Sequence, residues 1–270
     1  GTGGRSERKR GLDVPSHQGA IDWGAVKTDF SILRAGWSWY QGGMTQDQRF
    51  LENVKGVREA GLPWGAYLYA YDKTPEAARA SARKLGALLS GYQMEYPVAY
   101  DFEDPQYQQN TPEQNTAVCK AFLEELEGQG YYASLYTYAN FAKSKLRMEE
   151  LSRWDFWVAA YQSPLTSWTG SWGMWQYSAA GQVPGIQGNV DLDLARKDYP
   201  AIIRGAGLNG FGESPQQPEG CVPESGAETG GAAFPSPGQS SQALLAEYEA
   251  LLARHNALVA AIRQALEAAG

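Results

Sequence analysis

The sequence Pro97-Val-Ala-Tyr-Asp-Phe-Glu103-Asp104 is a short apolar run that ends in acidic residues. It lies between two segments with a helical pattern, Pro75–Leu89 and Pro112–Glu127. Each of these segments starts with a proline that follows a threonine, and these residue types are favoured at the first helical position and at the N-cap. A strand between two helices is typical of the βα units that surround a parallel sheet. The run therefore predicts an α/β fold with acidic side chains at the end of a central strand.

The same alternation of apolar runs and helical patterns continues on both sides, from Gly11 to about Phe211. Strands are expected at Leu12–Val14, Phe30–Gly36, Trp64–Tyr71, Pro97–Glu103, Tyr132–Tyr138, Asp155–Tyr161, Gly173–Tyr177 and Val190–Leu194. Helices are expected at Gln46–Ala60, Pro75–Leu89, Pro112–Glu127 and Asn140–Lys145. No helical period connects the last three strands. The pattern predicts a barrel-like α/β domain of about five βα units followed by three strands.

Composition divides the chain of 270 residues into four parts. Residues 1–10 are basic and glycine-containing, and we expect them to be disordered. Residues 11–207 form the predicted barrel. Residues 208–241 are rich in Gly, Pro and Ser and nearly lack aliphatic side chains, so they bury too little apolar surface to offset the entropy of ordering. They predict a flexible linker.

Residues 242–268 are predicted to form an amphipathic helix, because their apolar side chains recur with a spacing of three and four. The apolar stripe consists of Leu245, Tyr248, Leu252, His255, Val259, Ile262 and Leu266. A lone helix of this length is marginal in water unless its apolar face is covered. We expect it to join copies of the chain into a homo-oligomer. Docking on the barrel, and binding to another protein or to a cell wall, are the alternatives.

Hydrophobic residues make up 43% and charged residues 20% of the chain, which is ordinary for a globular protein. The apolar runs are far shorter than the roughly 20 residues that span a bilayer, so no membrane span is expected. The net charge is −7, and an acidic barrel argues against binding to nucleic acid. No signal peptide is visible at the N-terminus. The 16 Tyr and 9 Trp against 8 Phe favour rings with a polar tip, which suit sugar or protein surfaces.

Cysteine and histidine are scarce. Cys119 and Cys221 resemble neither a disulfide framework nor a set of zinc ligands, and we expect both to be free thiols. With His17 and His255 as the only histidines, a histidine-rich metal site is excluded. No metal or other cofactor is expected, and the chemistry should rest on carboxylates.

Asp101 and Glu103 are the strongest candidates for that chemistry. Alternate residues of a strand face the same side, with Cα atoms roughly 7 Å apart, so both carboxyls would share one site. The C-terminal ends of the strands form the active face of α/β barrels. Like charges held close together raise at least one pKa, which creates a proton donor near neutral pH. A solvated acidic turn that runs into Pro105 is the alternative.

Two further acids are candidates for the same site. Asp13 ends the first predicted strand and Asp191 lies in the last one, and these strands are neighbours in a closed barrel. Their carboxyls could therefore converge near the first pair. Asp193 faces the same side of the strand as Asp191 and is the alternative candidate for the acid that this strand supplies to the site. Taken alone, each acid could equally cap a helix or a turn.

Several other side chains are expected to contact a substrate. Tyr67, Tyr136 and Trp175 could stack on sugar faces, although barrel core is the alternative for each. Arg34 lies in an apolar strand and should not be buried without a partner, so we expect it to bond one of the acids. His17 follows the first strand and either lines the cleft or lies in a surface loop.

Eight short motifs occur in a fixed order along the chain. They are Arg10-Gly-Leu-Asp13-Val-Pro-Ser-His-Gln-Gly19, Phe30-Ser-Ile-Leu-Arg34-Ala-Gly36, Gly65-Ala-Tyr67-Leu-Tyr69, Tyr100-Asp101-Phe-Glu103, Gly130-Tyr-Tyr-Ala-Ser-Leu-Tyr136, Phe156-Trp157-Val-Ala-Ala-Tyr161, Trp175-Gln176-Tyr177 and Gly188-Asn-Val-Asp191-Leu. This series resembles family 25 of the glycoside hydrolases, the muramidase-type lysozymes of phage endolysins, bacteria and fungi. Each motif alone is weak, but the eight together cover about residues 10–200.

The resemblance implies a modified TIM-like barrel and hydrolysis of the β-1,4 bond between N-acetylmuramic acid and N-acetylglucosamine in bacterial peptidoglycan. It implies that Glu103 is the catalytic acid, that Asp101 is its partner, and that Asp13 and Asp191 support them. The chain departs from the common pattern in having Pro15 before Ser16-His17 and in having Ala160 before the tyrosine. These departures leave the acids untouched and bear on substrate preference.

Two other functions remain open at this stage. One is a peptidoglycan-binding barrel without catalysis, and the other is a hydrolase of chitin-like aminosugar polymers, in which Asp-x-Glu also occurs at a strand end. A catalytic barrel with a linker and a small C-terminal element is also compatible with a phage-encoded enzyme or with one released to the bacterial cell wall.

Overall fold

A computed structural model describes residues 8–162 and 164–212 of the chain. Most of the predicted linker and the whole of the predicted C-terminal helix, with its expected self-association, lie outside the described residues. Cys221 and His255 do so as well. Cys119 is a buried free thiol. Within the described part of the chain, no helix is long and apolar enough to cross a membrane.

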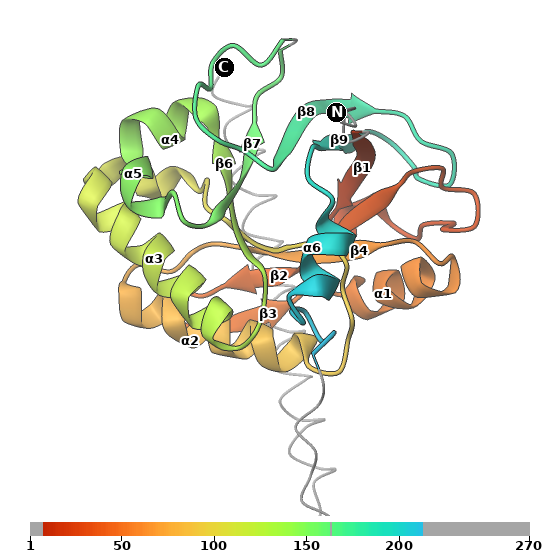
Figure 1. The fold of residues 1–270 in the computed structure, drawn as a ribbon, viewed down its shortest axis with the longest axis horizontal. Coiled ribbons are helices and arrows are strands. Elements are labelled where there is room, and N and C mark those ends of the chain that lie inside the picture. The colour runs from red at the N-terminus through yellow and green to blue at the C-terminus, as the bar shows by residue number, and fades with distance from the viewer. Residues whose placement is uncertain (1–7, 163, 213–270) are drawn as a thin grey trace, which may run out of the picture. The chain divides into compact units, whose positions relative to one another are not determined.

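Eight strands close into a barrel, and a ninth short strand extends it at one edge (Figure 1). The strands are β1 (Lys9–Val14), β2 (Phe30–Ser38), β3 (Met44–Gln46), β4 (Trp64–Tyr69), β5 (Val98–Asp101), β6 (Ala133–Tyr138), β7 (Asp155–Ala159), β8 (Met174–Gly181) and β9 (Val190–Ala195). Their order is β1-β9-β8-β7-β6-β5-β4-β2-β3, and a parallel pairing of β1 with β2 completes the ring. The expected α/β barrel is confirmed, with each of its eight predicted strands.

Helices cover the first part of the ring. They are α1 (Phe50–Glu59), α2 (Pro75–Leu89), α3 (Pro112–Gly128), α4 (Ala139–Lys145), α5 (Met148–Leu151) and α6 (Tyr199–Gly205). Short 3-10 turns, η1 (Ser16–Gln18) and η2 (Pro105–Gln109), follow β1 and β5. Thr74 and Thr111 cap α2 and α3 with their hydroxyls, as their positions before proline predict. Figure 1 shows α2 and α3 side by side on the outside of the barrel.

Several details differ from the sequence-based expectation, and three of them change the architecture. The helix expected from Gln46 starts at Phe50, because Met44–Gln46 pairs with the end of β2 as strand β3. β1 begins at Lys9, so the barrel includes two residues of the segment that was expected to be disordered. The first βα unit contains only the 3-10 turn η1 before β2. β3 was missed because its pairing is set by β2 rather than by an apolar run of its own.

The barrel has two distinct ends. β1, β2 and β4–β8 run parallel, so their C-terminal ends meet on one side, whereas β9 runs antiparallel to both of its neighbours. The beginning of β9 therefore lies at the C-terminal end of the barrel. The register places Asp13 directly opposite Asp191 and Gly11 opposite Asp193. All of the candidate acids thus belong to strands that bring them to the same half of the barrel.

Aromatic side chains fill the N-terminal end of the barrel. Phe30 stacks on Tyr96 at a centroid distance of 4.1 Å, and Tyr96 packs on Tyr199 of α6 at 5.4 Å. The Tyr199 hydroxyl donates to the buried Asp155 carboxylate at 2.5 Å, and Lys197 forms an ion pair with the same group at 2.9 Å. Aromatic packing and the Asp155 contacts close this end, whereas Asp101 and Glu103 at the C-terminal end each have a buried oxygen without a hydrogen-bond partner.

The packed barrel extends beyond Gly207, where the linker was expected to begin. Asn209 is fully buried and has a positive φ of 52°. Its side-chain amide donates to the carbonyls of Met94 and Tyr96, and its Oδ1 accepts from the backbone N–H of Tyr132. This one side chain therefore ties together the segments that precede β5 and β6.

We expect Asn209→Ala to lower the free energy of unfolding by about 1–3 kcal/mol, because two buried carbonyls and one N–H would lose their partner. Urea unfolding followed by tryptophan fluorescence measures the change. Asn140→Ala, at an exposed position of α4, is the matched control and should change stability little. Equal midpoints for the two variants would show that the hydrogen bonds of the Asn209 side chain do not stabilise the fold.

Candidate active site

The four acids singled out in the sequence come together at the C-terminal end of the barrel. Asp101 is the last residue of β5, and Glu103 follows two residues later. Asp13 lies near the end of β1, directly opposite Asp191 of β9. Asp13 and Asp101 are buried, while Glu103 and Asp191 are partly exposed. The arrangement is a group of carboxyls that reaches from the barrel interior to its surface.

Burial dominates the electrostatics of Asp101 and Glu103. It raises the pKa of Glu103 to about 7, with Asp191 and Asp104 adding to the rise and the Tyr138 hydroxyl opposing it. Burial also raises the pKa of Asp101 well above its usual range, and the nearby Glu103 charge raises it further. One side-chain oxygen of each has no hydrogen-bond partner. The pair therefore retains a proton near neutral pH.

Asp13 is held by one hydrogen-bonded residue, Gln176 of β8. The Gln176 amide donates to Asp13 at 2.8 Å, and its Oε1 accepts from the hydroxyls of Tyr136 at 2.7 Å and Tyr161 at 2.9 Å. Burial raises the pKa of Asp13 well above its usual range, and Asp193 and Asp191 add to the effect. Gln176 thus connects a buried acid to two phenols, one from β6 and one from the segment that follows β7.

Asp193 lies deeper in the barrel than Asp191. It is fully buried and accepts a hydrogen bond from the indole of Trp157 at 2.8 Å. Burial raises its pKa to about 7. Asp191 is partly exposed, and the charge of His17 lowers its pKa against the effect of burial. Of the two competitors, Asp191 is therefore the one that faces the outside of the site.

Arg34 does not bond any of the four acids, which corrects that expectation. Its guanidinium forms an ion pair with Asp47 at 2.7 Å and donates to the Ser16 hydroxyl at 3.0 Å. Asp47 also accepts from the backbone N–H of Ser16. Arg34 nevertheless acts on the site at a distance, since its charge lowers the pKa of Asp101.

The structure brings two of the three predicted aromatic contacts to the acids. Tyr67 and Tyr136 lie inside the barrel, where both pack against Trp157. Trp175 has the opposite strand parity to Gln176, packs on Trp172, and donates to the Ala160 carbonyl at 2.6 Å. It therefore lies on the outer side of β8. His17 is exposed in η1, close enough to Asp191 to affect its pKa.

Sequence reasoning missed four residues of this site. They are Asp47, which holds Arg34, Gln176, which holds Asp13, and Tyr138 and Tyr161, whose exposed rings flank the acids. Gln176 could have been found as a polar residue in an apolar strand. Within residues 8–162 and 164–212, no cluster of three or more His, Cys, Asp or Glu side chains is arranged to hold a metal ion.

Comparison with known proteins agrees with this geometry. The family described as Glycosyl hydrolases family 25 matches residues 12–186. The autolytic lysozyme of Clostridium acetobutylicum is 30% identical over 189 residues, which cover 68% of this chain and 55% of that protein. The modular autolysin LytC of Streptococcus pneumoniae has a similar structure, with a TM-score of 0.61 and 26% identity over 70% of this chain and 46% of its own.

A bacterial lysozyme from Streptomyces coelicolor shows the fold over nearly its whole length. Its TM-score is 0.62 at 24% identity, and the match covers 75% of this chain and 98% of that one. The chain belongs to glycosyl hydrolase family 25, because the family match extends over most of its length and includes Asp13, Asp101 and Glu103. It spans about half the length of the autolytic lysozyme and the autolysin that it matches.

The raised pKa of Asp193 predicts a pH-dependent cost to stability. An aspartate titrates near pH 4 when unfolded, and Asp193 titrates at about 7 in the fold. The stability that it contributes below pH 4 is therefore lost as the pH rises toward 7. Asp193→Asn keeps the acceptor for Trp157 without a buried charge, so we expect it to melt at a higher temperature than the parent at pH 7.

Thermal unfolding between pH 4 and pH 8 checks this expectation. The gain should be small at pH 4, where Asp193 is already neutral in the fold, and should grow toward pH 7. The control is Asp22→Asn, an exposed aspartate whose replacement should not produce such a trend. A variant that melts below the parent at every pH would contradict the assignment of a buried, costly carboxyl.

Proposed function

We propose that this chain hydrolyses the β-1,4 bond between N-acetylmuramic acid and N-acetylglucosamine in bacterial peptidoglycan. The observation that carries the proposal is the Asp101–Glu103 pair at the C-terminal end of the barrel, with the pKa of Glu103 raised to about 7. Membership of glycosyl hydrolase family 25 and the resemblance to an autolytic lysozyme support it. Two carboxyl groups of unequal acidity are sufficient for glycosidic cleavage.

Glu103 is the general acid in this proposal. Like charges keep the pair from ionising fully, so one proton stays with it near neutral pH. Burial and the charge of Glu103 hold the pKa of Asp101 well above its usual range and the charge of Arg34 opposes that rise, so the assignment of the shared proton to Glu103 is part of the proposal. Glu103 is also the more exposed of the two and can reach the oxygen of the scissile bond. Its proton goes to that oxygen as the C–O bond breaks, and a water molecule then adds to the anomeric carbon and returns a proton to Glu103.

Asp101 stabilises the positive charge that develops on the sugar. The charge lies at the anomeric carbon, or on the N-acetyl group of the substrate if that group attacks the carbon, and a buried carboxylate favours either form. Asp13 and Asp191 are placed beside the pair as supporting acids, and Gln176 fixes the position of Asp13. Tyr67, Tyr136 and Arg34 are the further candidates for contacts with the substrate.

The bacterial cell wall is then the site of action. The names of the relatives, an autolytic lysozyme and a modular autolysin, support this location. Release by a phage or by a bacterium are both compatible with it. An enzyme acting on chitin-like polymers is the second candidate, and the sugar at the new reducing end separates the two.

Glu103→Gln should keep the fold and lower the rate by about 10²–10⁴, because removal of a general acid typically costs that much. The measurement is the clearing of purified cell walls, followed by mass analysis of the reducing ends. We expect muramic acid at those ends with the parent chain. The control is Glu149→Gln, an exposed glutamate of α5. Wild-type clearing by the Glu103 variant, or N-acetylglucosamine at the reducing ends, would reject the proposal.

The pH dependence should report the proton on Glu103. A general acid must be protonated, so kcat/KM should fall as the pH rises through about 7. The Tyr138 hydroxyl lowers the pKa of Glu103, so Tyr138→Phe should move this fall to higher pH. Initial rates on soluble glycan between pH 5 and pH 9 measure both profiles. If Tyr138→Phe leaves the pH at which kcat/KM falls unchanged, or moves it to lower pH, the fall does not report the protonation of Glu103.

A further inference from the structure

A row of aromatic side chains leads from the acids to the edge of the barrel. Tyr69, at the end of β4, lies beside Asp104, to which its hydroxyl donates at 3.3 Å. Its ring centroid lies 5.0 Å from that of Tyr71, and Tyr71 meets the edge of Tyr40 at 5.9 Å. Tyr40 and its neighbour Trp39 form the turn between β2 and β3. The row therefore begins beside the catalytic pair and ends on the β2–β3 hairpin.

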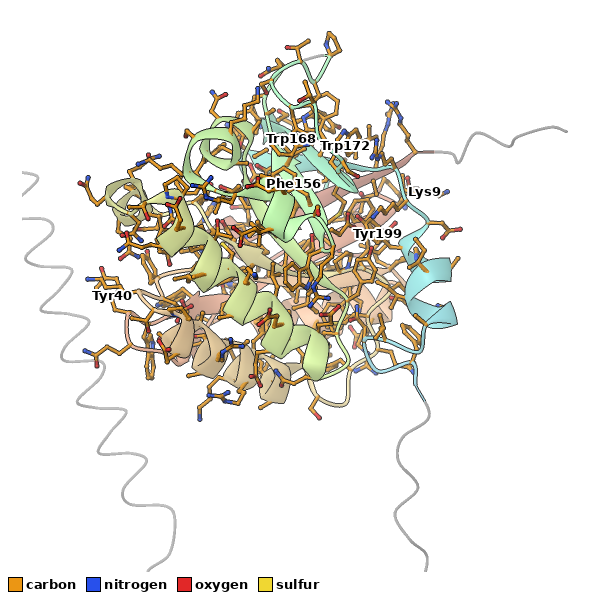
Figure 2. The ribbon with its side chains drawn as sticks, turned by 60° about the vertical axis from the view of Figure 1, so that its left-hand side comes forward. Lys9, Tyr40, Phe156, Trp168, Trp172 and Tyr199 are labelled. Carbon is orange, nitrogen blue, oxygen red and sulfur yellow. The ribbon has the colours of Figure 1, made fainter. Side chains whose placement is uncertain are left out.

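Tyr40, at the outer end of this row, and its sequence neighbour Trp39 are unusually accessible. Trp39 is 53% exposed and Tyr40 is 52% exposed. Figure 2 shows Tyr40 at one edge of the molecule, away from Lys9 and Tyr199 at its opposite side. Large exposed aromatic side chains that gather on one surface typically mark an interaction site, because the protein gains nothing for its own core from them.

Both rings are nevertheless held in place. The Trp39 indole donates to the Thr45 hydroxyl at 2.9 Å, and the ring lies over Gly43, where a side chain would collide with it. Gly43 has a φ of +101°, which a residue with a side chain rarely adopts. The Lys73 ammonium sits over the Tyr40 ring at 4.3 Å, and the Lys73 N–H donates to the Tyr40 carbonyl.

The hairpin itself is anchored to the barrel and to α2. The Ser81 hydroxyl accepts from the Gly43 N–H at 3.1 Å and donates its proton to the buried Asp72 carboxylate at 2.6 Å. The Ser38 hydroxyl accepts from the N–H of Tyr71 at 2.8 Å. Rings fixed before binding lose little conformational freedom when a ligand arrives, which favours affinity.

We propose that Trp39 and Tyr40 form a further binding surface for saccharide units of a glycan strand, beyond the units that flank the scissile bond. This inference rests on the proposed function, which supplies a polymeric substrate. Aromatic faces stack on the C–H faces of pyranose rings, and the contacts of Tyr69 with Tyr71 and of Tyr71 with Tyr40 connect the exposed rings to the acids. Lys73 adds a donor for hydroxyl and acetamido oxygens.

Continuity with the acids selects the glycan strand over a separate protein partner. A strand whose scissile bond lies at Glu103 would pass Tyr69 and Tyr71 before it reaches the hairpin. Long strands would reach this surface and gain binding affinity from it, whereas short fragments would not reach it. It would therefore determine how the enzyme discriminates between polymer and fragment.

The test uses the full chain with Glu103→Gln, so that bound glycan is not cut. Calorimetric titration compares glycan strands freed of stem peptides with a single disaccharide unit. We expect Trp39→Ala and Tyr40→Ala each to weaken binding of the strands by roughly three- to tenfold, as the loss of one stacking contact predicts, and to change disaccharide binding little. Trp39→Phe should restore most of the affinity. Ile202→Ala, an exposed apolar residue of α6, is the control.

Two results would overturn the inference. They are unchanged strand binding by both alanine variants and equal weakening for strand and disaccharide. The proposed function is tested separately by the reducing ends that the parent chain releases. If the alanine variants lose strand binding, the binding surface of Trp39 and Tyr40 is supported even if the parent chain releases no reducing ends. If strand binding is unchanged, the surface is rejected even if the parent chain proves to be a muramidase.

Discussion

The register between β1 and β9 is the constraint on which the whole site depends. β9 runs against both of its neighbours, so its first residues reach the same end of the barrel as the last residues of β1. Because side chains alternate along a strand, a shift by one residue would turn Asp191 and Asp193 away from the interior. The closure of the barrel and the assembly of its acids are therefore one event.

Gathering carboxyls in a barrel is costly, and the chain offsets the cost with neutral partners more than with cations. Asp13 is bonded to the amide of Gln176, and Asp193 to the indole of Trp157. The nearest cation, Arg34, is occupied by Asp47. A direct ion pair would have lowered the pKa of its acid. Without such an ion pair, burial raises the pKa of Glu103 to about 7, so this carboxyl can hold the proton that acid catalysis requires.

The sequence predicted the barrel well because its strands are apolar runs separated by helical patterns with clear caps. It predicted the meeting of Asp101 and Glu103 because strand parity and parallel pairing together define where a strand-end residue lies. Asp191 reaches the same end because β9 is antiparallel, which the sequence pattern did not indicate. It did not predict β3, the Arg34–Asp47 pair or the burial of Asn209. Each of these depends on a partner distant in the chain, and none has a periodic signal of its own. Adjacent residues of a strand face opposite sides, so an inward-facing Gln176 places Trp175 on the outer side of β8.

The division of the barrel into two ends also bears on its engineering. Lys9 begins β1 at the N-terminal end, and Gly210, close to the last described residue, packs against the backbone of Tyr92 beneath the same end. The acids and the hairpin of Trp39 lie at the other end. Circular permutation that joins these two points, with new termini opened in a loop on the outer side, should therefore preserve both binding surfaces.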